Sequence, residues 1–199
     1  MTETPTPMRL PTRFILVLLI LATSIGCDRA TKVVAESALE GRGRLSYLGD
    51  VFRFEYVRNS GAFLSLGAKL QEPLRTVLLQ GFVAVLVLGL VAYALMRGRR
   101  RVQVVALSLV AGGGIGNLWD RLVSGSVTDF MNLGIGPVRT GVFNVADLAI
   151  MAGVGMLIVW SKEVAPPAEL AVAGAPPGAP AESPPPPAAS PSPADEGKP

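Results

Sequence analysis

Two long runs of apolar residues without a single charge place the strongest constraint on what this chain can fold into. Residues 77–96 and residues 102–119 contain no Asp, Glu, Lys or Arg. Segments of about 20 apolar residues are what the hydrocarbon core of a bilayer requires of a helix, and a soluble protein of this size rarely buries several of them. Charged residues make up only 17% of the chain, compared with roughly a quarter in soluble domains. The sequence therefore predicts a membrane protein.

The apolar runs predict four transmembrane spans. The first run, residues 14–27, is short for a span, but it extends through Ala35 if its polar groups face protein and not lipid. The other spans are expected at residues 74–96, 102–121 and 141–161. We therefore predict an all-α membrane protein in which residues 13–162 form one domain of four transmembrane helices.

Residues 51–57, between the first two spans, alternate in character. Phe52, Phe54 and Tyr56 fall on one face, and Arg53 and Glu55 on the other. A period of two with aromatic residues is typical of a strand, so we predict a small extracytoplasmic β-element between spans one and two. Its aromatic face suits a sheet at the membrane interface, and a hairpin packed on its own loop is the alternative. Residues 131–140 are rich in Gly and are expected to form a short loop.

A cluster of arginines sets the expected topology. Arg97, Arg99, Arg100 and Arg101 crowd the turn between spans two and three, and dense positive charge in a short loop marks the cytoplasmic side. With four spans, both termini then lie in the cytoplasm.

The two ends of the chain differ in composition from its middle. Residues 1–12 are rich in Pro and Thr, and residues 163–199 are dominated by Pro and Ala. Such segments cannot bury enough apolar surface to offset the entropy of ordering. We expect a disordered N-terminus and a disordered cytoplasmic tail.

The rarest residue types exclude several kinds of chemistry. The chain has no His and only one Cys, Cys27, which excludes His-based triads, His metal sites and an intramolecular disulfide. A net charge of +3 gives no reason to expect nucleic-acid binding. Catalysis would have to come from carboxylates, hydroxyls, amides or cationic side chains, and no metal or organic cofactor is expected.

Polar residues gather at the ends of the spans that the topology places outside the cytoplasm. Charged groups within spans are costly and often functional, and a purely structural bundle has no need to bring several to one depth. The polar residues that gather there are Asp28, Lys32, Asn117, Asp120, Arg121, Asp129, Asn144 and Asp147.

Neighbouring positions suggest how some of these groups pair. Asp28 and Lys32 are four residues apart and share a helix face, so a simple ion pair is one interpretation. Asp120 and Arg121 point apart on a helix, so each is expected to pair across helices, with a structural role for Asp120. Gly112 and Gly116 have the spacing that permits close helix contact.

Asp129 and Asp147 are the most informative pair. Two carboxylates in a partly dry site share a proton, because both cannot ionise comfortably. One can then activate water while the other protonates a leaving amine. This dyad is the best route to amide hydrolysis that the residues offer.

Residues 59–63, taken alone, suit a turn.

Five short motifs, in order along the chain, resemble the lipoprotein signal peptidase family, also called signal peptidase II. The resemblance covers about residues 13–161 and leaves out the tail. The matching stretches are Asp28-x-x-Thr31-Lys32, Asn59-x-Gly61-Ala62-Phe63, Gly116-Asn117-x-x-Asp120-Arg121, Val127-x-Asp129-Phe130 and Phe143-Asn144-x-Ala146-Asp147.

The resemblance implies a function and a set of roles. The function is that of an aspartic endopeptidase of the bacterial inner membrane. It would cleave diacylglyceryl-modified prolipoproteins before the lipidated Cys, as a monomer in contact with membrane lipid. Asp129 and Asp147 would be catalytic, and Asp120 would stabilise the fold. Supporting or substrate-binding roles would fall to Asp28, Lys32, Asn59, Gly61, Asn117, Arg121 and Asn144. Gly141-Val142 stands before Phe143, where many family members carry a Pro.

Two other functions fit parts of the sequence. Arg9, Arg13 and the apolar run ending in Gly26-Cys27 are similar to a lipoprotein signal peptide, so the chain could itself be a precursor cleaved before Cys27. Three further spans follow, which argues against this. A small non-enzymatic channel or transporter subunit would instead carry charges at mid-span, and spans two and three carry none there.

Overall fold

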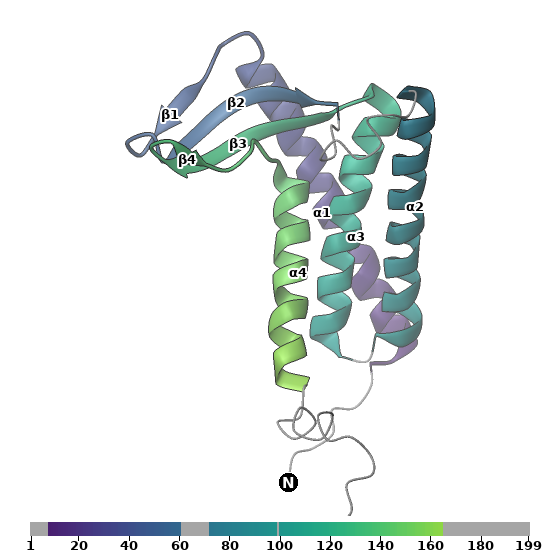
Figure 1. Cartoon of the computed structure of the whole chain (residues 1–199). Coiled ribbons are helices and arrows are strands. Elements are labelled where there is room, and N and C mark those ends of the chain that lie inside the picture. The colour runs from purple at the N-terminus through teal and green to yellow at the C-terminus, as the bar shows by residue number, and fades with distance from the viewer. Residues whose placement is uncertain (1–7, 61–71, 99, 165–199) are drawn as a thin grey trace, which may run out of the picture. The chain divides into compact units, whose positions relative to one another are not determined.

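The computed structural model of the protein describes residues 8–60, 72–98 and 100–164. Within them, the helices run along one another and a small sheet lies at one end of the helices (Figure 1). The elements are α1 (Leu10–Leu39), β1 (Leu45–Tyr47), β2 (Phe52–Asn59), α2 (Glu72–Arg97), α3 (Arg101–Ser124), β3 (Val127–Ile135), β4 (Val138–Arg139) and α4 (Val145–Val164).

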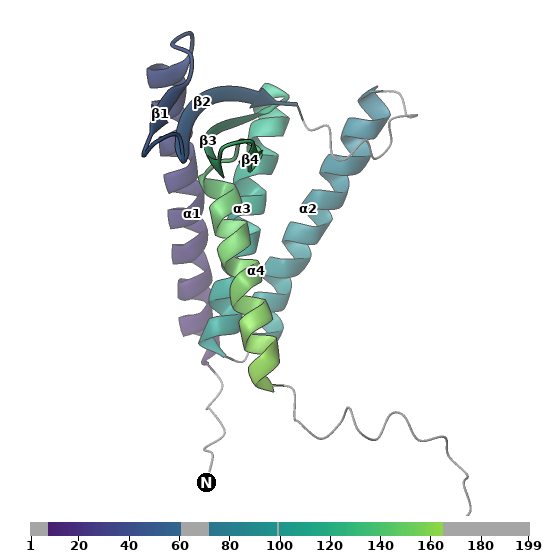
Figure 2. The ribbon, with the colours of Figure 1, turned by 60° about the vertical axis from the view of Figure 1, so that its left-hand side comes forward.

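Helix α3 lies at the centre of the helices. It packs against α1, α2 and α4, whereas α1 makes much smaller contacts with α2 and α4. Figure 2 shows α2 leaning away from the others toward the sheet end. Side chains on α3 can therefore face three different helices.

Helix α1 begins earlier than the sequence suggested. Pro11 stands in its first turn, where the missing amide hydrogen costs nothing and the fixed φ favours the helix. Residues 10–12, which we expected to be disordered, are therefore helical. Residues 1–7 lie outside the described part of the chain. The same holds for the expected tail from residue 165 onward, while residues 163 and 164 end α4.

The buried side chains of α1 form one stripe. They are Val17, Ser24, Asp28, Lys32, Ala35 and Leu39, spaced three, four or seven residues apart, as one helix face requires. Asp28 and Lys32 belong to this stripe, so the polar groups at the end of the first span face protein. This is the condition under which the sequence allowed that span to extend through Ala35.

Glycines on α3 allow the helices to approach closely. A Cβ on Gly112 would lie 2.8 Å from Cβ of Ser24 on α1, and one on Gly116 would lie 2.7 Å from Oδ2 of Asp28. A Cβ on Gly113 would strike the backbone carbonyl of Ala146 on α4. The expected close contact at Gly112 and Gly116 is therefore present, and Gly116 also makes room for a carboxylate.

The sheet is built from two separate connections of the chain. Its strand order is β1-β2-β3-β4, and every neighbouring pair is antiparallel. The predicted strand at residues 51–57 is confirmed as most of β2. The expectation of a loop at 131–140 was wrong, because β3 and β4 occupy most of it. Residues 127–133 of β3 pair with β2. This pairing stabilises β3, and the composition of residues 131–140 alone does not reveal it.

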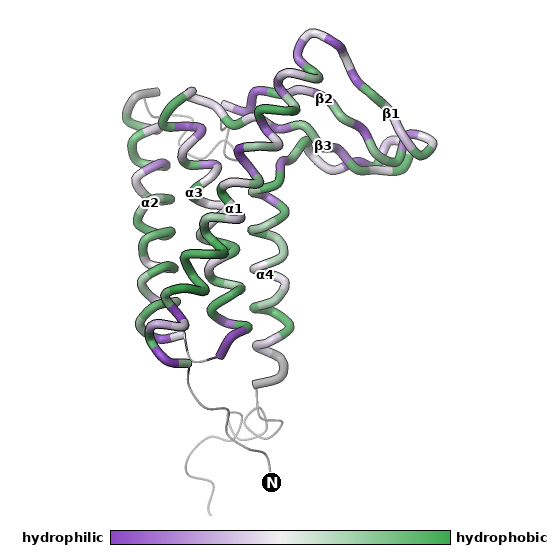
Figure 3. Tube along the Cα trace, turned by 180° about the vertical axis from the view of Figure 1, so that it is seen from behind, coloured by the Kyte–Doolittle hydropathy of each residue, from purple (hydrophilic) through white to green (hydrophobic). Residues whose placement is uncertain are grey.

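The outer surfaces of the helices are strongly apolar. Phe82, Val85 and Leu88 on α2 and Met151 on α4 are all about 70% exposed, and hydrophobic residues dominate the length of the helices (Figure 3). Within the part of the chain that the structure describes, three helical segments are long and apolar enough to cross a membrane: Leu10–Leu39, Thr76–Arg97 and Arg101–Ser124. The apolar stretch of α4, Val145–Ser161, is shorter. Its helix begins at Val145, four residues after the expected start of span four.

Candidate active site

The first turn of α4 holds Asp147 through a reciprocal cap. The backbone N–H of Asp147 donates to Oδ1 of Asn144 at 3.0 Å, and the backbone N–H of Asn144 donates to Oδ2 of Asp147 at 3.1 Å. This is the geometry of a capping box, in which the residue before the helix and its third residue satisfy each other's free N–H groups. Asn144 is fully buried. The carboxylate of Asp147 is thus fixed by the start of the helix.

Asp129 lies in β3, beside the start of α4. It is 3% exposed, and its two oxygens accept hydrogen bonds from the side-chain amides of Asn144 (2.6 Å) and Asn59 (2.9 Å). Burial raises the pKa of Asp129 and the nearby charge of Asp147 adds to that rise, while the two amides oppose it. Asp147 is therefore close enough to influence the ionisation of Asp129, and we call Asp129 and Asp147 the amide-bridged pair.

Asn117 on α3 completes the bridge. Its Nδ2 donates to Oδ1 of Asp147 at 2.8 Å. Its Oδ1 accepts from Nδ2 of Asn144 at 3.1 Å and from Nζ of Lys32 at 3.0 Å. Because two donors hold the oxygen, the amide nitrogen must face Asp147.

A second group of charges lies on the α1 side of Asn117. Nζ of Lys32 is 2.7 Å from Oδ2 of Asp28 and 2.8 Å from Oδ2 of Asp120. All three side chains are at most 5% exposed, and Oδ1 of Asp28 accepts from the backbone N–H of Ala146 at 2.9 Å. We call Asp28, Lys32 and Asp120 the ion cluster. It joins α1, α3 and the start of α4.

Comparison with known proteins gives the family. The sequence model described as signal peptidase (SPase) II matches residues 20–162. The chain belongs to the signal peptidase II family. The family indicates a protease, and together with the apolar helices it indicates a bacterial membrane protein.

Individual members of the signal peptidase II family agree with this match. The chain is 35% identical to a lipoprotein signal peptidase of Brevibacillus brevis over 142 residues, covering 71% of this chain and 91% of that protein. It is 32% identical to one of Geobacter metallireducens over 145 residues, covering 70% and 85%.

A solved structure has the same fold. It is described as a bacterial membrane enzyme and superposes with a TM-score of 0.64 at 21% identity, covering 82% of this chain and all of the other.

The structure brings together most of the residues singled out for the signal peptidase II site. Asp28, Lys32, Asn117, Asp129, Asn144 and Asp147 form one connected network, and Asn59, the last residue of β2, contacts it through Asp129. Asp28 and Lys32 do pair, and Asp120 does pair across helices, with Lys32 and with Arg29 at 3.4 Å. Gly61 lies outside the described residues.

The expected pairing of Arg121 with a residue on another helix is not found in the described residues. Its guanidinium donates to the carbonyl of Asn117 on its own helix, at 3.2 Å. It interacts electrostatically with Asp129 and Asp147, but no described residue forms an ion pair with it. Sequence reasoning also missed the cap at α4, although Asn144 and Asp147 stand at the spacing that signals one.

Proposed function

We propose that the protein removes signal peptides from diacylglyceryl-modified prolipoproteins by cleaving the peptide bond before the lipidated Cys. Membership of the signal peptidase II family supports the substrate class. The observation that carries the reaction is the amide-bridged pair. Two carboxylates from different elements, Asp129 and Asp147, are joined by Asn117 and Asn144. Among the described residues no Lys or Arg forms an ion pair with either.

The reaction is of the aspartic type, with one proton shared by the pair. Asp129 is buried and its pKa is raised, so it holds the proton. Asp147 lies in the first turn of α4, where the helix dipole favours a negative charge. Ionised Asp147 takes a proton from water as the water oxygen attacks the scissile carbonyl carbon. The proton of Asp129 passes to the leaving amine nitrogen as the C–N bond breaks, and the pair again holds one proton.

The supporting residues hold this arrangement. Asn59 and Asn144 orient the carboxylate of Asp129, and Asn117 orients that of Asp147. Arg121 adds positive potential beside both, which suits the negative charge that develops on the carbonyl oxygen. The ion cluster stabilises the helices around them, with Asp120 in a structural role.

The protein lies in the inner membrane as a monomer. In this topology α4 is the fourth span, both termini and the tail are cytoplasmic, and the sheet with the amide-bridged pair lies outside the cytoplasm. The arginine-rich turn after α2 supports this orientation. The apolar faces of the helices support contact with membrane lipid. Residues 13–162 form the peptidase domain, flanked by residues 1–12 and 163–199.

Cleavage of a defined substrate by purified protein tests the function. A prolipoprotein carrying a diacylglyceryl Cys should be cut on the N-terminal side of that Cys. The same precursor without the lipid should be cut far more slowly. A strong chelator should leave the rate unchanged. Cleavage at another bond would contradict the proposed substrate class, and loss of activity with the chelator would contradict the aspartic mechanism.

A further inference from the structure

The end of β2 that carries Asn59 is set apart from the rest of the strand by a β-bulge. The register of β2 against β3 shifts between Phe54 and Val57, where two residues of β2 lie opposite Phe130 alone. Such a bulge interrupts the ladder and bends the strand. The ladder then continues for three pairs, which end at Asn59. The segment from which Asn59 contacts Asp129 is therefore short and separate from the rest of the sheet.

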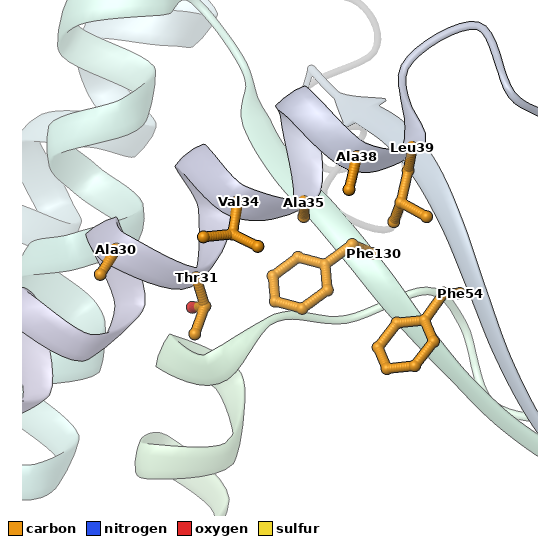
Figure 4. Close-up of a pocket in the computed structure, with 8 residues that line it drawn as sticks. All are labelled: Ala30, Thr31, Val34, Ala35, Ala38, Leu39, Phe54 and Phe130. Carbon is orange, nitrogen blue, oxygen red and sulfur yellow. The ribbon is translucent and has the colours of Figure 1, made fainter.

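The two sides of the bulge are held in different ways. Before it, the rings of Phe54 and Phe130 lie opposite the aliphatic side chains of α1 (Figure 4), and Phe54 packs against the cluster of Ala35, Leu39 and Phe130. After it, residues 57–59 are all exposed. Apolar packing therefore fixes the first part of β2, and the end of the strand needs another kind of attachment.

Arg58 supplies that attachment through its side chain. Its Nε donates to Oγ of Ser126 at 2.8 Å, and its Nη2 donates to the backbone carbonyl of Ser124 at 3.2 Å. Its Nη1 is also 3.9 Å from Oε1 of Glu36 on α1. Both side chains of this ion pair are 45% exposed, and exposed ion pairs contribute little. The two hydrogen bonds, which the rigid guanidinium fork can make together, therefore hold the end of β2.

The two serines lie on either side of the turn that leads to Asp129. Ser124 is the last residue of α3, the residue after it has a φ of 72°, and Ser126 stands directly before β3. The carbonyl groups at the end of a helix favour a nearby cation. Asp129 follows Ser126 by three residues. Arg58 thus binds the connection that delivers Asp129, while its neighbour Asn59 contacts Asp129 directly.

We propose that Arg58 is a positioning residue for peptide-bond cleavage, which holds the amide of Asn59 against the carboxyl group of Asp129. This inference rests on the proposed function, in which Asp129 holds the shared proton. Successive side chains of a strand point to opposite faces, so Arg58 fixes the strand from one face and Asn59 meets Asp129 on the other. In the described part of the chain, no hydrogen bond or ion pair joins Arg58 to either carboxylate of the amide-bridged pair.

The pH dependence of cleavage distinguishes positioning from a general effect on stability. Burial raises the pKa of Asp129, and the hydrogen bond from Asn59 opposes that rise. The groups that face Asp129 from the helices are Asp147 and Asn144 at the start of α4, Lys32 on α1 and Arg121 on α3. These groups are unchanged when Arg58 is replaced. A change in the pKa of Asp129 would therefore report the loss of the amide of Asn59.

Removal of the guanidinium by Arg58→Met tests the proposal. The alkaline limb of the kcat/KM profile should move to higher pH by up to about one unit, as in Asn59→Ala. The double variant should show no larger shift than Asn59→Ala alone, because both changes remove the same contact. Arg44→Met is the matched control, since Arg44 is 53% exposed and 3.5 Å from Glu55. Its limb should stay in place.

Ser126→Ala separates the position of Arg58 from its charge. It removes one acceptor and leaves the guanidinium in place, so the limb should move in the same direction by a smaller amount. It also decides the matter if Arg58→Met does not fold. A limb that stays in place in Ser126→Ala and in folded Arg58→Met, even with a lower unfolding temperature, would make Arg58 purely structural and overturn the proposal.

Two further outcomes would also overturn the role of Arg58. Shifts of Arg58→Met and Asn59→Ala that add in the double variant would assign the effect to the charge of Arg58. A limb that Asn59→Ala itself does not move would remove the contact on which the proposal depends. In each case normal cleavage by the unaltered protein leaves the proposed substrate class intact, whereas absence of cleavage contradicts the proposed function itself.

Discussion

The ion cluster and the amide-bridged pair use the same acidic side chain in opposite ways. In the ion cluster, two aspartates face one lysine at 2.7 and 2.8 Å, so a cation holds both carboxylates in place. In the amide-bridged pair, Asp129 and Asp147 face asparagine amides, which fix their positions without supplying a charge. A nearby cation favours the ionised form of a carboxylate, whereas a neutral amide fixes a carboxylate without adding a charge. Position and charge are thus controlled by separate sets of residues.

The largest difference should appear when a carboxylate of the amide-bridged pair is replaced by its amide. Asp129→Asn and Asp147→Asn keep nearly the same shape but cannot exchange the shared proton. We expect each to lower kcat about ten-thousand-fold, the upper range for lost acid–base catalysis, with little change in thermal stability. Cleavage assays and thermal unfolding in detergent measure both. If either variant turned over at a near-normal rate, that aspartate would not be in the dyad.

Substitution in the ion cluster should have the opposite effect, because it should lower the stability of the protein. Lys32→Met leaves Asp28 and Asp120 buried together without their cation, and breaking a buried pair typically costs about 3–5 kcal/mol. We expect a large fall in the unfolding temperature. Arg29→Met is the matched control, since Arg29 is 55% exposed and 3.4 Å from Asp120. Exposed pairs contribute about 0–1 kcal/mol. Equal effects of the two variants would contradict the proposed structural role of the ion cluster.

A smaller effect should appear in the pH profile when one amide is removed from Asp129. The hydrogen bond from Asn59 lowers the pKa of Asp129, so Asn59→Ala should raise it further. Because Asp129 acts in its protonated form in the proposed mechanism, kcat/KM should be lost as the pH rises through that pKa. The alkaline limb should therefore move to higher pH, by up to about one unit. Asn132→Ala is the control, since Asn132 contacts Thr140 and Arg139. A limb that stays in place or moves down would assign the proton to another group.

The smallest effect is expected from the tail. Residues 165–199 are dominated by Pro and Ala, and no apolar periodicity there could dock on the helices. Deleting them should leave the cleavage rate and the unfolding temperature nearly unchanged. We expect this because neither the ion cluster nor the amide-bridged pair should depend on the tail. A large loss of activity would show that the tail contacts the membrane domain.

Much of the fold could be predicted because the bilayer imposes simple rules. The uncharged run at residues 77–96 predicted most of α2, which begins five residues earlier, and the alternation at 51–57 predicted most of β2. Strand β3 was missed because Gly134, Gly136 and Pro137 are typical of loops. Its stability comes from β2, which is distant in sequence.

The candidate site was predictable in its residues but not in its connections. Charged and amide residues at the span ends marked the polar network. The orientation of Asn117 depends on donors from two other elements, Lys32 and Asn144, which spacing within one helix cannot show. The cap between Asn144 and Asp147 did have a local signal, an Asn three residues before an Asp at the start of an apolar run.

The pairing of β2 with β3 has a consequence for how the protein is made. Helices α2 and α3 lie between the two strands in the sequence, so β2 is synthesised well before its partner. In the proposed topology, β2 crosses the membrane first and waits with one edge unpaired until β3 has followed. Asn59 meets Asp129 only then, and Asp147 is fixed later still, when α4 starts. On the proposed mechanism, a partly synthesised chain has no catalytic centre, so the nascent protease would be unable to cut neighbouring membrane proteins before its own insertion is complete.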